Sequence, residues 1–191
     1  MSPRTSEQFS EMRESARKRI MEAALELFAN KGYHTTSISQ IAKEAAISKG
    51  LMYNYFESKE ALLKEVIFEG VDTITESFDP NRDGILTKEE LIHFIRQSFK
   101  LVREHTTYWK LYFSLLTQAG IMDIFSDDLA PRMQRLFGML TQFFYSQNYE
   151  NPEIEMRFFG SLLDGVAMNF VMDPENFPIN EIERKIIEMY K

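Results

Sequence analysis

The chain has 191 residues, a formal net charge of −7 at pH 7 and no cysteine. Disulfide bonds and thiolate metal sites are therefore excluded, and a hydrophobic fraction of 44% is enough for a packed core. No stretch approaches the roughly 20 apolar residues of a membrane helix. The polar start MSPRTSEQFSEMRES lacks the apolar run of a signal peptide. We therefore expect a soluble, cytoplasmic protein without a membrane partner.

The charge is unevenly distributed along the chain. Residues 1–60 hold nine Lys or Arg and eight Asp or Glu, a net charge of +1, and the remaining residues carry −8. Only the first third can approach phosphates without strong repulsion, and the sequence RKR at residues 17–19 strengthens that tendency. A solvated helix face explains such a cluster equally well, so charge alone does not decide.

Helical periodicity dominates the sequence, and no alternating pattern predicts a strand. The first predicted helix spans about residues 14–31, where apolar residues form one stripe, and Gly32 suits its left-handed cap. Two short helices joined by a tight turn follow. Ser37 and Gln40 have the spacing of a capping box at the first, and Ser48 can cap the second, which spans about residues 49–56.

Six longer helices are expected after the two short ones. Their approximate ranges are residues 58–78, 89–104, 108–118, 129–147, 152–172 and 179–190. The predicted fold is therefore all-α, with about nine helices in total: a three-helix domain that contains a helix-turn-helix, followed by a second helical domain.

The second short helix has the residue types that nucleic-acid contacts need. A helix-turn-helix places its second helix in the major groove. Ser48 and Lys49 stand at the start of that helix, where backbone N–H groups favour a phosphate, and Gly50 lets the backbone come close. Asn54 can read adenine bidentately, and Tyr53 suits a phosphate contact. A helical bundle whose short helices merely carry polar surface is the alternative.

The stretch RKRIMEAALELFANKGYHTTSISQIAKEAAISKGLMYNYFESKEALLKEV resembles the N-terminal domain of the TetR family of bacterial transcription regulators. The matching motifs are LF…GY…T, IA..A and S.G..Y.YF.SKE.L, and they cover about residues 14–66. The resemblance implies a DNA-binding domain at residues 1–58 and an effector-binding and dimerisation domain at residues 59–191. It implies a homodimeric repressor that leaves a palindromic DNA operator when a small-molecule effector tilts the fourth helix.

By matching position, the resemblance also implies which residues contact DNA. They are Thr36, Ser48, Lys49, Gly50, Tyr53, Asn54, Tyr55 and Lys59. The pairing of Asn54 with Tyr55 is this chain's own, so the operator sequence does not carry over from the family.

The second half of the chain is rich in aromatic residues, which suits a hydrophobic or aromatic effector, although an ordinary packed core explains most of them. The candidate pocket residues are two aromatics and four polar residues on apolar helices: His93, His105, Trp109, Tyr112, Gln118 and Asn169. By resemblance, the dimer interface lies on the last two long helices. Its expected apolar residues are Phe158, Phe159, Leu162, Leu163, Val166 and Phe170.

The sequence has no signature of an enzyme. It lacks a Gly-rich phosphate loop, a nucleophile elbow and the HExxH metal motif, and its three histidines have no ligand spacing. We therefore expect a protein that is not an enzyme and requires no cofactor.

Residues 79–90, DPNRDGILTKEE, have the spelling of an EF-hand calcium loop. The ligands would be Asp79, Asn81, Asp83, the carbonyl of Ile85, Thr87 and a bidentate Glu90. Alternatively, Thr87 and Glu90 form a capping box for the next helix, and Asp79-Pro80 and Asp83-Gly84 are ordinary turn dipeptides. A calcium-responsive or calcium-stabilised regulator is thus the alternative function, with weak binding at roughly 10⁻⁴ to 10⁻³ M because the loop stands alone.

Overall fold

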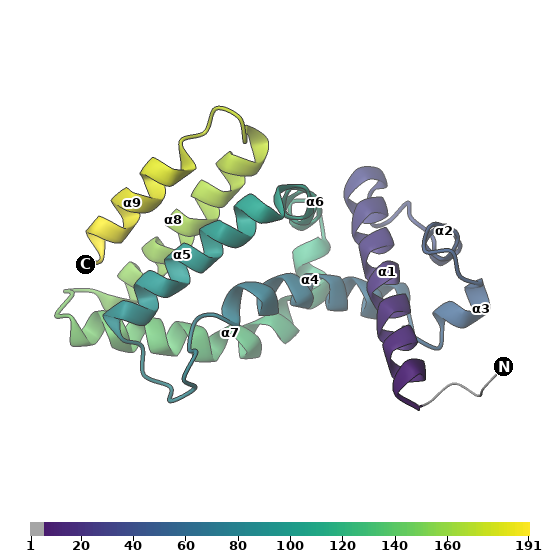
Figure 1. The fold of residues 1–191 in the computed structure, drawn as a ribbon, viewed down its shortest axis with the longest axis horizontal. Helices are drawn as coiled ribbons and strands as arrows, with labels where there is room; N and C mark the ends of the chain where they lie inside the picture. Colours follow the sequence, from purple (N-terminus) through teal and green to yellow (C-terminus); the bar gives the residue numbers. More distant parts are fainter. Residues whose placement is uncertain (1–5) are drawn as a thin grey trace. The chain divides into compact units, whose positions relative to one another are not determined.

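The computed structural model describes residues 6–191, and within that range the chain forms nine α-helices and no strand (Figure 1). The helices are α1 (Ser6–Lys31), α2 (Ile38–Glu44), α3 (Lys49–Met52), α4 (Lys59–Thr75), α5 (Lys88–Glu104), α6 (Thr106–Leu116), α7 (Ile121–Ser146), α8 (Pro152–Met172) and α9 (Ile179–Met189). The predicted all-α fold is therefore confirmed. The first five residues of the predicted DNA-binding domain, which begin the polar N-terminal stretch, lie outside the described residues.

The chain divides into two compact units. Unit 1 comprises the described residues up to Glu69 together with Ser114–Phe125, and unit 2 comprises Gly70–Phe113 and Ser126–Lys191. The sequence boundaries between them fall inside α4, α6 and α7. No helix in the described part of the chain is long and apolar enough to cross a membrane.

Unit 1 is built on the apolar stripe of α1. Ile20, Ala24 and Phe28 are completely buried, and α1 packs against α2, which packs in turn against α3. The segment Ser114–Phe125 contributes to the same unit, where the Phe125 ring meets Phe68 edge-on at 6.3 Å. Since these aromatic and aliphatic side chains exclude water, they fix the short helices that carry little hydrogen bonding of their own.

The turn between α2 and α3 follows the sequence prediction closely. Ser37 forms the predicted capping box with Gln40: the Gln40 amide donates to Ser37 Oγ, and the Ser37 amide donates to Gln40 Oε1 at 2.7 Å. Ala46 turns the chain with a left-handed backbone, φ 55°. The helix α3 ends at Met52 rather than near residue 56, because the following residues continue as tight turns, with the Asn54 amide donating to the Leu51 carbonyl.

Unit 2 has an aromatic core between α5, α8 and α9, which pack pairwise against one another (Figure 1). Phe159 of α8 lies 6.4 Å from Phe94 and 5.2 Å from Tyr190, measured between ring centroids. At the other end of this core, Phe78 meets Phe94 edge-on at 4.9 Å. Such edge-on pairs add to the stabilisation from burial because ring edges and faces carry opposite partial charge.

Two helices, α1 and α7, begin earlier than the sequence predicts, and the predicted range of α8 is correct. The helix α1 begins at Ser6, eight residues earlier than expected. The helix α7 begins at Ile121, not near residue 129, and continues through Pro131 in its interior. The range of α8 was predicted correctly, and Pro152 stands in its first turn.

Candidate functional site

The residues after the α2–α3 turn form an exposed polar surface in unit 1. Ser48, Lys49, Gly50, Tyr53 and Asn54 are all exposed, Tyr53 with 51% of its surface. Ser48 Oγ accepts the Leu51 amide at 3.2 Å and so caps α3. A side chain added at Gly50 would meet nothing within 4 Å, so this edge of α3 is open to an incoming partner.

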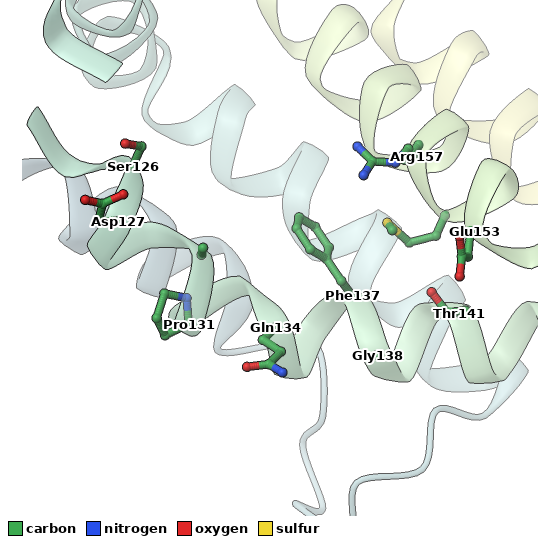
Figure 2. Close-up of a pocket in the computed structure, with 11 residues that line it drawn as sticks. Ser126, Asp127, Pro131, Gln134, Phe137, Gly138, Thr141, Glu153 and Arg157 are labelled. Carbon is green, nitrogen blue, oxygen red and sulfur yellow. The ribbon is translucent and has the colours of Figure 1, made fainter. Parts of the chain in front are cut away.

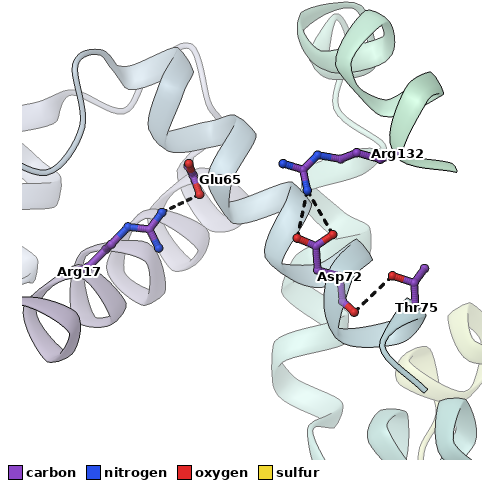
Figure 3. Close-up of polar contacts among 5 residues, drawn as sticks. All are labelled: Arg17, Glu65, Asp72, Thr75 and Arg132. Atoms are coloured by element: carbon purple, nitrogen blue, oxygen red, sulfur yellow. Dashed lines mark hydrogen bonds and ion pairs between the residues drawn. The ribbon is translucent and has the colours of Figure 1, made fainter. Parts of the chain in front are cut away.

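Two arginines of α1 contact residues that belong to this surface or follow it in the chain. Arg13 donates to the Asn54 carbonyl at 3.4 Å, and its guanidinium lies 5.9 Å from the centroid of the half-buried Tyr55 ring. Arg17 lies over the Phe56 ring at 5.4 Å and pairs with Glu65 at 2.6 Å (Figure 3). The basic cluster at residues 17–19 gave a signal for Arg17, but its guanidinium is engaged within unit 1.

Two of the predicted DNA contacts bond to main-chain carbonyls of unit 1. Thr36 is 1% exposed, and its hydroxyl lies within hydrogen-bond distance of two carbonyls, Gly32 at 2.8 Å and Leu27 at 3.2 Å, which share its single proton. The Lys59 ammonium donates to the carbonyls of Tyr33 and Thr36 and lies 4.3 Å from the centroid of the Tyr33 ring. Thr36 is therefore buried in the loop before α2, which corrects its expected place among the DNA contacts. Lys59 bonds to the same loop, and its contact with DNA stays a prediction.

The predicted pocket residues do not form one cluster. Trp109 and Tyr112 of α6 are buried side by side in unit 2, with ring centroids 5.3 Å apart. His93 on α5, His105 between α5 and α6, and Asn169 on α8 are all exposed. Gln118 belongs to unit 1, where its side-chain amide accepts the Tyr33 amide at 3.0 Å and donates to the Phe28 carbonyl at 2.7 Å.

The aromatic cluster around Trp109 lies in an acidic surrounding that sequence reasoning missed. Tyr108 stacks on Tyr112 with an interplanar angle of 18°. Desolvation raises the pKa of the Tyr112 phenol, and the charges of Tyr108, Asp164 and Asp72 raise it further. Asp164 reaches solvent, yet the surrounding protein desolvates its carboxylate enough to raise its pKa. No described residue hydrogen-bonds the buried Trp109 Nε1.

Unit 2 has an open groove of about 750 Å³ between α7 and α8. Figure 2 shows Pro131, Gln134 and Phe137 from α7 on one side and Glu153 and Arg157 from α8 on the other. None of the predicted pocket residues lines it. The interior Pro131 lacks an amide hydrogen, so it cannot donate the regular helical hydrogen bond to the carbonyl of Asp127, another residue that lines the groove.

The predicted dimer residues divide between two faces of α8. Phe159 and Phe170 are 1% and 7% exposed and belong to the core of unit 2, which corrects their expected place on the interface. Phe158 is 48% exposed, whereas Leu162, Leu163 and Val166 are half-buried. The sequence showed one broad apolar set because a helix with an inward and an outward apolar stripe cannot be separated by hydrophobicity alone.

The loop at residues 79–90, which we call the acidic loop, joins α4 to α5 within unit 2. Phe78 and Leu86 are buried and anchor it, while Ile85 is 67% exposed. Arg82 and Gly84 have left-handed backbones, φ 59° and 81°. The side chains of Asn81 and Asp83 accept from nearby loop amides and bond to each other at 3.0 Å. The loop thus has a defined conformation.

The closing residue of the acidic loop points to its own helix. Glu90 Oε2 accepts from the amide and the hydroxyl of Thr87, at 2.9 and 2.8 Å, which completes the predicted capping box of α5. No group of three or more His, Asp or Glu side chains in the described residues is arranged to hold a metal ion.

Asp79, the first residue of the acidic loop, has an unusual environment. Its side chain is 10% exposed and pairs with Arg135 of α7 at 2.6 Å through Oδ2. The same Oδ2 accepts the Gly84 amide at 3.3 Å, so the carboxylate faces into the loop. The other oxygen, Oδ1, is buried and has no hydrogen-bond partner among the described residues.

Comparisons with known proteins match this arrangement. Residues 20–66 match the family described as bacterial regulatory proteins, tetR family. The HTH-type transcriptional regulator YuxN of Bacillus subtilis is 60% identical over 50 residues, which cover 26% of this chain and 17% of that relative. The chain therefore spans only a small part of that relative's length.

Two solved structures resemble the whole fold. The transcriptional regulator FadR from Bacillus subtilis, in complex with stearoyl-CoA, aligns with a TM-score of 0.71 at 23% identity over 91% of this chain and 96% of that one. NalD, the secondary repressor of the MexAB-OprM multidrug efflux pump in Pseudomonas aeruginosa, aligns with a TM-score of 0.69 at 22% identity over 93% and 94%. Residues 20–66 therefore match the tetR family, and the described chain has the same all-helical fold as these two solved regulators.

Proposed function

We propose that this chain is a DNA-binding transcriptional repressor that binds a palindromic operator as a homodimer and is released by a small-molecule effector. The observation that carries the proposal is the exposed row of Ser48, Lys49, Gly50, Tyr53 and Asn54 on a domain that matches the TetR family. DNA binding belongs to residues 1–58, and effector binding and dimerisation to residues 59–191. Binding to chromosomal DNA agrees with a place in the cytoplasm.

Within the exposed row we assign different tasks to the side chains. Lys49 and Ser48 contact phosphates, and Tyr53 donates its hydroxyl to a third. Asn54 reads a base, because its amide matches the acceptor and donor of adenine in the major groove. Tyr55 is half-buried under Arg13 and contributes through its edge.

Selection from random DNA followed by gel shift tests this assignment. We expect enrichment of a palindromic site, and Asn54→Ala loses about 1–3 kcal/mol of binding and relaxes specificity at one base pair of each half-site. Lys49→Ala weakens binding to all sequences alike, and it reduces the slope of log binding constant against log salt concentration by about one. Lys110→Ala, an exposed lysine of unit 2, is the matched control. Unchanged binding by both variants contradicts the proposal.

We propose that the effector is hydrophobic or aromatic and binds near Trp109 and Tyr112. The relative FadR was solved with stearoyl-CoA, so this fold accommodates a large apolar molecule in that protein. Trp109 is the only tryptophan of the chain, so its fluorescence reports directly on this region. Titration with a panel of hydrophobic compounds should quench the emission and release the operator in the same concentration range. Release of the operator without a change in Trp109 emission would mean that the effector does not bind near Trp109.

We propose that the homodimer forms through the outer face of α8. Ile154 and Phe158 are 66% and 48% exposed there, and an added Cβ at Gly160 or Gly165 meets nothing within 4 Å in the protomer. An isologous contact buries such a face against its own copy. Analytical ultracentrifugation should detect a dimer for the wild type and a monomer for Phe158→Asp. Tyr145→Asp on α7, which is 69% exposed, should stay dimeric.

As a second candidate function, we propose that calcium binds the acidic loop and stabilises or regulates the repressor. The specific observation is the buried Asp79 Oδ1 without a partner among the described residues, in a loop with the EF-hand spelling. Calorimetry with calcium tests it on the wild type and on Glu90→Gln, which preserves the capping box because Gln also serves at that position. Equal heats from both proteins contradict calcium binding through Glu90.

A further inference from the structure

The ion pair between Asp79 and Arg135 ties the acidic loop to α7 by a single carboxylate. The Asp79 side chain is 10% exposed and is therefore held by the surrounding protein, whereas the Arg135 side chain is 64% exposed and lies largely in solvent. Only Oδ2 takes part, and it also holds the Gly84 amide. The carboxylate therefore has one oxygen in use and one buried oxygen, Oδ1, for which no described residue provides a donor.

A calcium ion supplies what Oδ1 lacks. Calcium prefers six to eight oxygen ligands, and the first residue of an EF-hand loop contributes one carboxylate oxygen. The exposed side chains of Asn81 and Asp83 and the carbonyl of Ile85 follow in the loop, and their present hydrogen bonds are local and exposed to water. Glu90 must exchange its bond to Thr87 for the ion.

The ion and the Arg135 guanidinium would then be two cations on one carboxylate. They would stand within a few ångströms of each other, which is well inside the Debye length of about 8 Å at physiological ionic strength. Each therefore weakens the interaction of the other with Asp79. Thermodynamic reciprocity requires that the factor by which Arg135 weakens calcium binding equals the factor by which calcium weakens the Arg135 pair.

We propose that calcium and Arg135 oppose each other at Asp79, so that calcium binding releases α7 from the acidic loop. This inference rests on the proposed calcium binding and extends it to a structural output. Arg135 is flanked on α7 by Pro131, Gln134 and Gly138, which line the groove in Figure 2. Calcium would thereby make the α7 side of that groove more mobile. In this segment Pro131 already interrupts the helical hydrogen bonds.

Arg132 provides a matched control. It stands on the same helix and pairs with Asp72 through two hydrogen bonds of 3.2 and 3.0 Å, as Figure 3 shows, but Asp72 lies in α4 and not in the acidic loop. Its side chain is 45% exposed, so Arg132→Gln and Arg135→Gln each remove one exposed arginine of α7 that is paired with an aspartate, although Asp72 is 55% exposed and Asp79 only 10%.

The experiment is calorimetry with calcium chloride on the full-length wild type, Arg135→Gln, Arg132→Gln and Glu90→Gln. We expect Arg135→Gln to bind calcium about threefold to tenfold more tightly than the wild type, since surface pairs and couplings have that size. Arg132→Gln should match the wild type, and Glu90→Gln should bind at least tenfold more weakly. Hydrogen exchange of α7 amides near Arg135 should accelerate with calcium in the wild type and not in Glu90→Gln.

Three outcomes overturn the inference. Equal or weaker calcium binding by Arg135→Gln means that Arg135 orients Asp79 instead of opposing the ion. Unchanged exchange in α7 means that calcium does not release the helix. Absence of any calcium-dependent heat in the wild type removes the site itself. Operator binding, measured by gel shift in buffer with a chelator, is independent of all three, so failure here is distinguishable from failure of the repressor function.

Discussion

In unit 1, the buried hydroxyl of Thr36 shares its proton between two main-chain carbonyls, whereas in unit 2 the buried hydroxyl of Ser98 has no hydrogen-bond partner among the described residues. The contrast extends to larger groups. Gln118 satisfies two backbone groups in unit 1, while Asp79 Oδ1 and Trp109 Nε1 in unit 2 lack partners in the described part of the chain.

The difference indicates what each unit is built to do. A buried polar atom without a partner costs about 1–3 kcal/mol, and in the described part of unit 1 no buried side-chain nitrogen or oxygen lacks a partner. Unit 1 presents its function on an exposed surface and keeps its interior closed. Unit 2 retains unpaired polar atoms in the acidic loop and beside the aromatic cluster, the two places where we propose that ligands bind.

The largest effect that tests this contrast is expected from Gln118→Ala. The substitution leaves the Tyr33 amide and the Phe28 carbonyl without their partner, so the free energy of unfolding should fall by about 2 kcal/mol. Urea denaturation measures it. Gln134→Ala, at an exposed site on α7, should change stability by less than about 0.5 kcal/mol. Equal effects of the two variants would contradict a stabilising role for the hydrogen bonds of Gln118 to Tyr33 and Phe28.

Thr36→Val should have the next largest effect. Valine keeps the shape of threonine but cannot donate to the carbonyls of Leu27 and Gly32, and the expected loss of stability is about 1–2 kcal/mol. Thermal unfolding at neutral pH measures the loss. A variant as stable as the wild type would show that the two carbonyls find other donors, and unit 1 would not be as closed as described.

Ser98→Ala should not lower stability, in contrast to Thr36→Val. Because no described residue bonds the buried hydroxyl, its removal should leave stability within about 0.5 kcal/mol of the wild type or raise it. The same unfolding measurement compares it with Thr36→Val. A loss as large as that of Thr36→Val would mean that the Ser98 hydroxyl is satisfied by water, and the contrast between the units would fail at this position.

The smallest effect concerns pH. Desolvation raises the pKa of the Asp164 carboxyl, so the folded protein binds this proton more tightly than the unfolded chain does. Stability is therefore lost as pH rises from the ordinary Asp range, near 4, through the raised pKa of the folded state. Asp164→Asn should be slightly more stable than the wild type at pH 7, and this advantage should disappear at pH 3. An advantage that is the same at both pH values, or that Asp173→Asn shares, contradicts this assignment.

Local motifs were the most predictable part of the fold. The capping boxes at Ser37 and Thr87 and the start of α8 at Pro152 depend on side chains within four residues of each other, and all three were predicted correctly. The match of residues 20–66 to the TetR family agrees with the motifs read from the sequence. Such features need no knowledge of the rest of the chain.

Long-range partners could not be predicted. Thr36, Lys59 and Gln118 are polar residues whose partners are main-chain carbonyls and amides positioned only by the folded loop before α2. The ion pair between Asp79 and Arg135 joins residues 56 positions apart and has no local signal. The two faces of α8 were merged because both are apolar, and only the packing of Phe159 against Phe94 separates them.

The return of Ser114–Phe125 into unit 1 has a consequence for how the protein is made. Gln118 bonds to residues 85 and 90 positions earlier, and Leu115 and Ile121 are completely buried. A nascent chain that has emerged only as far as α4 therefore holds an incomplete unit 1. The unit can close only after about 50 further residues have left the ribosome, which takes several seconds at ordinary synthesis rates of about 5–20 residues per second.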